Sequence, residues 1–89
     1  MKPSMIINIE QIKVIHTNDI VRKTDQGWTI DTRKIVNEDV YYAFNLGNET
    51  YFAKKFGNTV RVYEVIKIND RKVVLIPLFE VTLQNVLTN

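Results

Sequence analysis

The sequence has no cysteine, one histidine (His16) and one serine (Ser4). The lack of cysteine excludes disulfides and thiolate chemistry, so stability does not depend on the redox compartment. One serine and one histidine cannot build a Ser/His/Asp or Cys/His site, and the scattered acidic residues show no spacing typical of a metal site. We therefore expect a protein that is not an enzyme, with no cofactor, no metal and no small-molecule substrate.

Long apolar runs and glycine-rich loops are also missing. The longest apolar run, 73–79, is interrupted by Pro77 and is much shorter than the roughly 20 residues that cross a bilayer. Residues 1–15 lack the features of a signal peptide, and the three glycines are isolated, which excludes a phosphate-binding loop. These absences predict a cytoplasmic protein without a membrane-spanning segment.

Neither sign of charge is in large excess, because 12 Lys and Arg residues stand against 10 Asp and Glu residues and give a net charge of +2. This small excess is weak evidence for a nucleic-acid partner. Hydrophobic residues make up 45% of the 89 residues, which is too many for intrinsic disorder. The length fits one domain, residues 1–89, with a single modest core and no deep cavity.

Turn-forming pairs divide the second half of the chain into short segments rich in Val, Ile, Tyr and Phe. The pairs are Gly47-Asn48, Gly57-Asn58 and Asn69-Asp70, and each suits a two-residue primed hairpin turn. The pattern predicts a mainly β fold. We expect an antiparallel meander that closes into a small single-domain barrel or a strongly curved sheet. A short C-terminal helix is an alternative for the end of the chain.

The remaining segments are less regular. Residues 5–15 change parity near Glu10 and Gln11, which favours a strand with a bulge over a short helix because β-branched residues dominate. Residues 20–23 and 28–30 flank a turn-forming tetrapeptide and predict a hairpin, in which Trp28 is expected to plug the core.

Two stretches fit more than one structure. Residues 31–39 favour a strand followed by a turn at 37–39, with a helical turn capped by Asp31 or Thr32 as the alternative. Residues 79–87 fit a strand and a helix equally well.

Two-residue turns would fix the pairing register, because residues equidistant from a turn lie opposite each other on one face. The first face would then be nearly all apolar and should form the core, with Glu49, Lys55 and Glu64 as exceptions. It collects Val40, Tyr42, Phe44, Leu46, Tyr51, Ala53, Val60, Val62, Ile66, Ile68, Val73 and Leu75. The second face would carry Tyr41, Ala43, Asn45, Thr50, Phe52, Lys54, Arg61, Tyr63, Val65, Lys67, Lys72, Val74 and Ile76.

Two interpretations of the second face remain open. In one, its aromatic residues form a second buried layer under the N-terminal strands, with the cations at the rim. In the other, the rings are exposed platforms on which bases or aromatic side chains stack. The cations, which have no acid opposite them in the sheet, then bind a negatively charged partner. The candidate binding residues are Tyr41, Phe52, Lys54, Arg61, Tyr63, Lys67 and Lys72.

Residue types typical of protein interfaces are present in this set, and an open strand edge would add strand pairing with a partner or with a second copy. We therefore expect a non-catalytic interaction module, of the adaptor or inhibitor type, that binds a protein partner or forms a homo-oligomer. Binding of single-stranded nucleic acid at the same face is the alternative.

Overall fold

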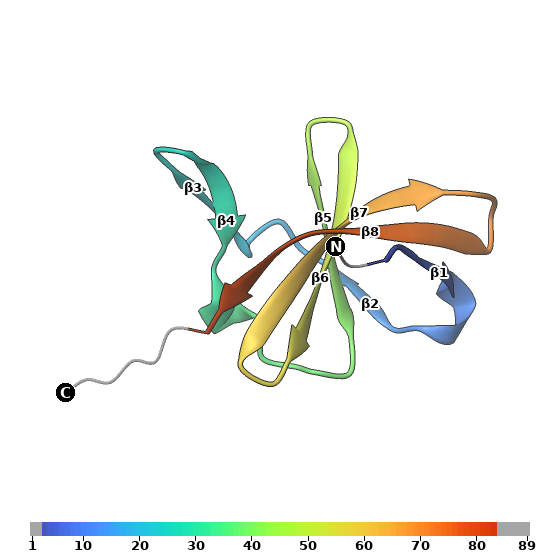
Figure 1. Ribbon diagram of the computed structural model, residues 1–89, viewed down its shortest axis with the longest axis horizontal. Helices are drawn as coiled ribbons and strands as arrows, with labels where there is room; N and C mark the ends of the chain where they lie inside the picture. The colour runs from blue at the N-terminus through green and yellow to red at the C-terminus, as the bar shows by residue number, and fades with distance from the viewer. Residues whose placement is uncertain (1–2, 84–89) are drawn as a thin grey trace.

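The computed structural model describes residues 3–83, which form a mainly β fold with two single-turn 3-10 helices, η1 and η2 (Figure 1). The elements in chain order are β1 (Met5–Asn8), η1 (Ile9–Gln11), β2 (Val14–His16), β3 (Val21–Thr24), β4 (Gly27–Ile30), η2 (Thr32–Lys34), β5 (Tyr41–Leu46), β6 (Glu49–Phe56), β7 (Thr59–Lys67) and β8 (Lys72–Thr82).

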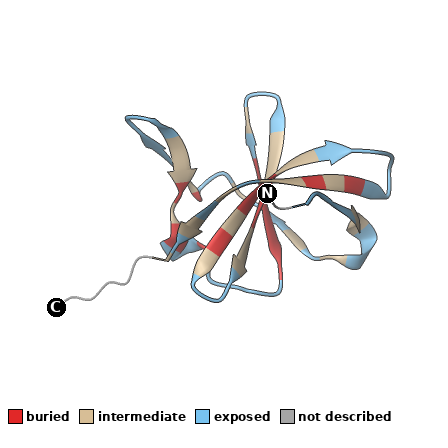
Figure 2. Ribbon diagram, in the orientation of Figure 1, coloured by how far each residue is buried: buried red, intermediate tan, exposed pale blue. Residues whose placement is uncertain are grey.

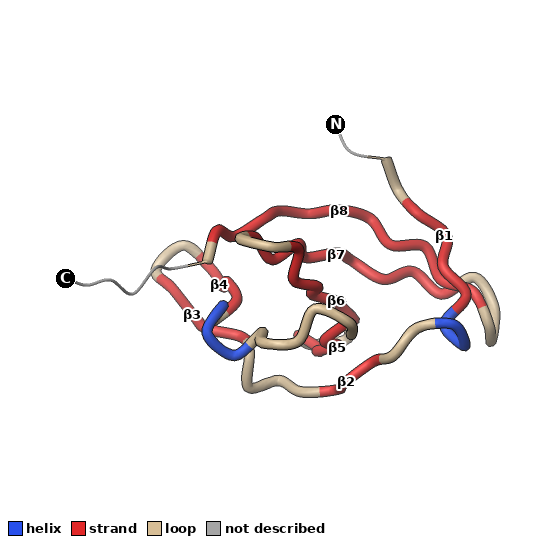
Figure 3. Tube along the Cα trace, turned by 90° about the horizontal axis from the view of Figure 1, so that it is seen from below, coloured by secondary structure: helices blue, strands red, loops and turns tan. Residues whose placement is uncertain are grey.

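Six strands form one strongly curled sheet in the order β1-β8-β7-β6-β5-β2, while β3 and β4 form a separate hairpin. The predicted meander from β5 to β8 is confirmed, and its curl gives a half-barrel, as Figure 3 shows. The sheet is mixed rather than purely antiparallel, because β2 pairs with β5 in parallel.

The first two predicted turns are confirmed. Leu46 pairs with Glu49 across Gly47-Asn48, and Phe56 pairs with Thr59 across Gly57-Asn58. The two glycines have φ angles of 61° and 58°, and no other residue type among 3–83 has a positive φ. A positive φ at the first turn position alone is the pattern of a type II′ turn, in which glycine avoids the Cβ clash.

The third predicted turn, at Asn69-Asp70, is wrong. The loop is longer, because the Ile68 N–H donates to the Lys72 carbonyl (3.0 Å) and the Asn69 side chain accepts from the N–H of Arg71 and of Lys72 (2.8 and 3.0 Å). Lys67 consequently pairs with Val73 instead of Lys72. This shift by one residue reverses the faces of the first part of β8.

A β-bulge in β8 then restores the predicted parity. Tyr63 pairs with Pro77 and Val62 with Phe79, so Leu78 is the extra residue. Phe79 therefore lies on the first face beside Val62, whereas Leu75 lies on the second face.

The N-terminal segments differ in detail from the expectations. The parity change in residues 5–15 is η1, whose start is capped by the Asn8 side chain, so two strands replace one bulged strand. The hairpin of β3 and β4 is confirmed. The strand favoured for 31–39 is wrong, and the alternative holds, because Asp31 caps η2 by accepting from the Arg33 N–H.

At the C-terminal end, β8 runs to Thr82, so the first residues of the 79–87 stretch are strand. Residues 84–87 of that stretch lie outside the described residues.

Two buried clusters lie on opposite faces of the sheet, and Figure 2 shows the buried positions at the centre of the molecule. The first contains Ile20, Ile30, Ile35, Val40, Tyr42, Phe44, Ala53, Val60 and Val62, with Trp28 against it. The second contains Tyr41, Ala43, Phe52, Tyr63, Val73 and Leu75, with Ile7, Ile9, Ile12 and Val14 packed on it. The β3–β4 hairpin and η2 thus cover the first face, and β1, η1 and β2 cover the second.

The expected role of Trp28 as a core plug is confirmed. Its ring lies edge-on to those of Phe44, Tyr51 and Phe79, with centroids 5.2–5.6 Å apart.

Candidate protein-interaction surface

The three aromatic candidates project together from the second face, but into the interior. Tyr41 is 9% exposed, Phe52 6% and Tyr63 2%, and the rings of Tyr41 and Phe52 lie 5.5 Å apart. The interpretation of these rings as exposed stacking platforms is therefore wrong, and the buried-layer interpretation holds. The register shift explains the burial, because it adds Val73 and Leu75 to this face, which the N-terminal segment then covers.

The four cationic candidates do not form one site. Lys54 and Arg61 pair at one end of the sheet. Lys67 lies six residues further along β7, about 20 Å away at 3.3 Å per residue. Lys72 does not pair with Lys67 and lies on the first face. No continuous basic groove joins these side chains.

Arg61 has an acid opposite it, contrary to expectation. Its Nε lies 2.8 Å from Oε2 of Glu80, and hydrogen bonds to the Tyr63 hydroxyl and to Glu80 raise the pKa of Arg61. Lys67 Nζ lies 3.8 Å from a carboxylate oxygen of Asp70. These intramolecular pairs reduce the positive potential available to a phosphate backbone.

Lys54 is also engaged within the chain. Its ammonium group donates to the Glu38 carbonyl and lies 5.0 Å from the centroid of the Phe56 ring. Arg61 Cζ lies 4.5 Å from the same centroid, so both cations contact one half-exposed ring. The predicted combination of aromatic and basic groups thus survives only as this small cluster at the end of β6.

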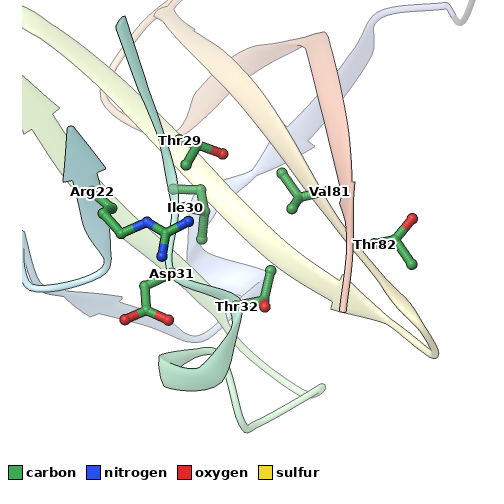
Figure 4. Close-up of a pocket in the computed structure, with 7 residues that line it drawn as sticks. All are labelled: Arg22, Thr29, Ile30, Asp31, Thr32, Val81 and Thr82. Atoms are coloured by element: carbon green, nitrogen blue, oxygen red, sulfur yellow. The ribbon is translucent and has the colours of Figure 1, made fainter. Parts of the chain in front are cut away.

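Two shallow recesses flank the sheet. One, of about 290 Å³, is lined by Pro3, Met5, Arg61, Tyr63 and Pro77. The other, of about 100 Å³, lies between β4, η2 and the end of β8 and is shown in Figure 4, where Val81 points toward β4. Its carboxylate, Asp31, is held by Arg33 (3.2 Å), which lowers the pKa of Asp31 by hydrogen bonding.

Neither recess is lined by a serine or histidine side chain of the described residues. Among residues 3–83, no three His, Asp or Glu side chains come together in a way that could hold a metal ion. Within the same range, no helix is long and apolar enough to cross a membrane.

The most distinctive surface is an aliphatic patch that the sequence prediction missed. Ile6, Val74 and Ile66 are direct cross-strand neighbours on the first face of β1, β8 and β7, and Ile76 follows Val74 on the same face. Ile6 is 67% exposed and Ile66 46%, while Val74 and Ile76 are half-buried. This part of the first face lies beyond the β3–β4 hairpin. Exposed apolar patches of this kind often mark interaction sites.

The prediction placed Ile66 in the core and Val74 on the opposite face. The longer loop after Lys67 moves Val74 to the first face, whereas Ile66 lies on the predicted face and is exposed because no other described element covers this end of it. Ile6 had no predicted strand partner, so no signal in the sequence could add it to the patch.

The edge segments of the six-stranded sheet at β2, the second half of β8 and β1 differ in their protection against strand addition. β2 is three residues long and carries His16, with Lys13 just before it. The second half of β8 begins with Pro77 and the bulge at Leu78, and both features oppose pairing with another strand. β1, beside the aliphatic patch, has no charged residue and no proline within Met5–Asn8.

The missing backbone N–H groups of two prolines explain why β1 is short. It pairs with Lys72–Leu75 only, and the next hydrogen-bonded pair in this register would join Pro3 to Pro77, neither of which has an N–H. Figure 3 shows β1 at the end of the curled sheet, next to part of β8, with its N-terminal end directed away from the other strands.

No family model, curated protein or solved structure matches the chain. Function is therefore inferred from the surface.

Proposed function

We propose that this protein is a non-catalytic interaction module, of the adaptor or inhibitor type, that binds a protein partner at the aliphatic patch and the adjoining edge of β1. The observation that carries the proposal is the row Ile6–Val74–Ile66, which ends at an edge strand without charge or proline. A partner strand added to β1 gains backbone hydrogen bonds from the edge and apolar contact from the patch.

The same features disfavour nucleic acid as the partner. The patch has no aromatic ring on which a base could stack, and the rings of Tyr41, Phe52 and Tyr63 are buried. Lys54 and Arg61 already contact groups of the chain. Protein binding is therefore the function that the surface supports best.

A capture experiment with matched variants tests the proposal. Ile66→Lys charges the patch and leaves every backbone group in place, whereas Val36→Lys charges an equally aliphatic but separate site that is 72% exposed. Proteins from the source cell that are retained by the wild type and by Val36→Lys should be lost with Ile66→Lys. An identical set with all three baits would overturn the proposal.

Hydrogen exchange and a nucleic-acid titration complete the test. A purified partner should slow exchange of the outward-facing amides of Ile6 and Asn8. A labelled single strand should show no salt-dependent binding, and salt-dependent binding that persists in Ile66→Lys would support the nucleic-acid alternative instead.

A further inference from the structure

We propose that the partner at this surface is a second copy of the chain, which pairs its own β1 with β1 in antiparallel orientation about a two-fold axis at Ile6. The inference rests on the proposed function, because it assigns an occupant to the same edge and patch.

The backbone of β1 presents a self-complementary set of groups. The Ile9 N–H donates to the Arg71 carbonyl (2.8 Å), so Ile9, Ile7 and Met5 direct their backbone groups toward β8. Ile6 and Asn8, with Ser4 before the strand, therefore direct theirs outward. A two-fold axis at Ile6 pairs Ile6 with Ile6 and places Ser4 of each copy opposite Asn8 of the other, so all three residues lie at hydrogen-bonding positions, with the Asn8 carbonyl shared with η1, which this residue caps.

Charge favours a second copy over a partner of a different kind. An edge that pairs with itself brings identical residues together, and like charges directly opposite each other are destabilising. Met5–Asn8 contains no ionisable side chain, so self-pairing meets no repulsion, and there is no charge for an oppositely charged segment to match. The edge of β2, by contrast, would bring two copies of Lys13 and His16 close together.

Side chains of the first face reinforce the pairing. Ile6 lies beside Val74 and Ile66 within one copy, and the axis would place it beside Ile6 of the second copy. The two aliphatic patches would then form one continuous apolar strip across β7, β8 and β1 of both molecules.

The expected dimer is weak. A stable interface buries about 800 Å² per partner and involves about 20–30 residues a side, whereas this contact consists of a four-residue edge and the side chains of Ile6, Val74 and Ile66. Sedimentation should therefore show a monomer at low protein concentration and a dimer that increases with concentration.

Disulfide trapping tests the axis, because the chain has no native cysteine. Opposite residues of a hydrogen-bonded antiparallel pair have Cα atoms about 5.5 Å apart, which lies within the Cα range of disulfides, and a shift of the two edge strands by about 1 Å brings their Cβ atoms within disulfide reach. Under mild oxidation, Ile6→Cys should form the covalent dimer at least about tenfold faster than Val36→Cys, because pairing raises the effective thiol concentration. The two positions are similarly exposed, at 67% and 72%.

A second pair of variants tests the register. Ser4→Cys mixed with Asn8→Cys should yield the mixed disulfide, while Ser4→Cys alone should dimerise no faster than Val36→Cys. Circular dichroism confirms that Asn8→Cys folds, because this variant loses the cap of η1.

Equal trapping rates for Ile6→Cys and Val36→Cys, with a wild type that stays monomeric at high concentration, would overturn the second copy as partner. With that outcome, the proposed function would still hold if Ile66→Lys no longer captured a protein that the wild type captures. If Ile66→Lys captured the same proteins as the wild type, both proposals would be refuted.

Discussion

Truncation of Tyr63 should strongly destabilise the fold rather than remove a binding contact. The side chain is 2% exposed, pairs across the sheet with Phe52 and belongs to the second buried cluster. Truncating a buried aromatic residue to alanine costs about 3–5 kcal/mol. At about 0.05–0.15 kcal/mol per residue, a chain of this length has a free energy of unfolding of about 4–13 kcal/mol. Tyr63→Ala therefore removes at least about a quarter of the stability.

The expected decrease in the melting temperature is about 12–40 °C, at 4–8 °C per kcal/mol for a domain of this size. Urea unfolding followed by Trp28 fluorescence measures the change. Trp28 packs against the first cluster, on the opposite face of the sheet from Tyr63, so it reports unfolding of the whole domain.

Tyr63→Phe is the matched control, because it keeps the ring and removes only the hydroxyl, so it should destabilise the protein much less than Tyr63→Ala. A loss below about 1 kcal/mol for Tyr63→Ala would refute the burial of this ring and return it to the surface as a binding residue.

Three further changes have defined outcomes. Gly57→Ala should lower the free energy of unfolding in urea by about 1–2 kcal/mol, because φ is +58° there and no atom within 4 Å would clash with the added Cβ. Burial of the Tyr41 hydroxyl, and to a smaller extent the charge of the nearby Tyr63, raise its pKa above 10.0. The contribution of this hydroxyl to the free energy of unfolding should therefore be fully present below pH 10 and decline as pH rises through the folded pKa. The urea midpoint of Tyr41→Phe should fall less steeply over this range. The lowered pKa of Asp31 gives a pH dependence of the opposite sign. Its contribution to the free energy of unfolding is present above pH 3.8 and is lost as pH falls through the folded pKa. Asp31→Asn, which still caps η2, should remove that dependence in acid unfolding followed by circular dichroism.

Local turn chemistry made the central part of the fold predictable. Gly47 and Gly57 each supply the positive φ that a two-residue turn needs, and the pairing of β5, β6 and β7 follows from them by symmetry about each turn. Equal distances from the Gly57-Asn58 turn place Phe52 opposite Tyr63 and Lys54 opposite Arg61, as the structure shows. These pairs depend only on residues that are close in sequence.

The loop between β7 and β8 was not predictable in the same way. Asn69-Asp70 contains no glycine, and the loop is closed by the Asn69 side chain, which accepts from two backbone N–H groups. An asparagine side chain can substitute for a backbone turn in this manner, so the pair does not define the loop length. The bulge at Leu78 was missed as well, because it depends on contacts across the sheet rather than on local sequence.

The candidate site was predicted least well because it depends on which element covers which face. The types of residue at the second face indicated a binding surface, yet the same apolar side chains provide most of the free energy when β1, η1 and β2 cover them. The 3-10 turn η2, with Asp31 as its cap, competes with a strand in the sequence pattern, because a single capped turn has almost no periodicity.

The curl of the sheet links these outcomes. Each cover is too short to protect a whole face, since the β3–β4 hairpin has strands of four residues and β1 has four, whereas β7 has nine and β8 eleven. One half of each face of the long strands is therefore left uncovered. The second face leaves Phe56 exposed and Lys54 and Arg61 half-buried, and both cations are engaged within the chain, Arg61 by Glu80 and Lys54 by the Glu38 carbonyl. The first face leaves Ile6, Ile66 and Val74, which water solvates poorly. An aliphatic surface beside an uncharged edge gains free energy when another strand covers it, and the charged half-face does not, so binding is expected at the first.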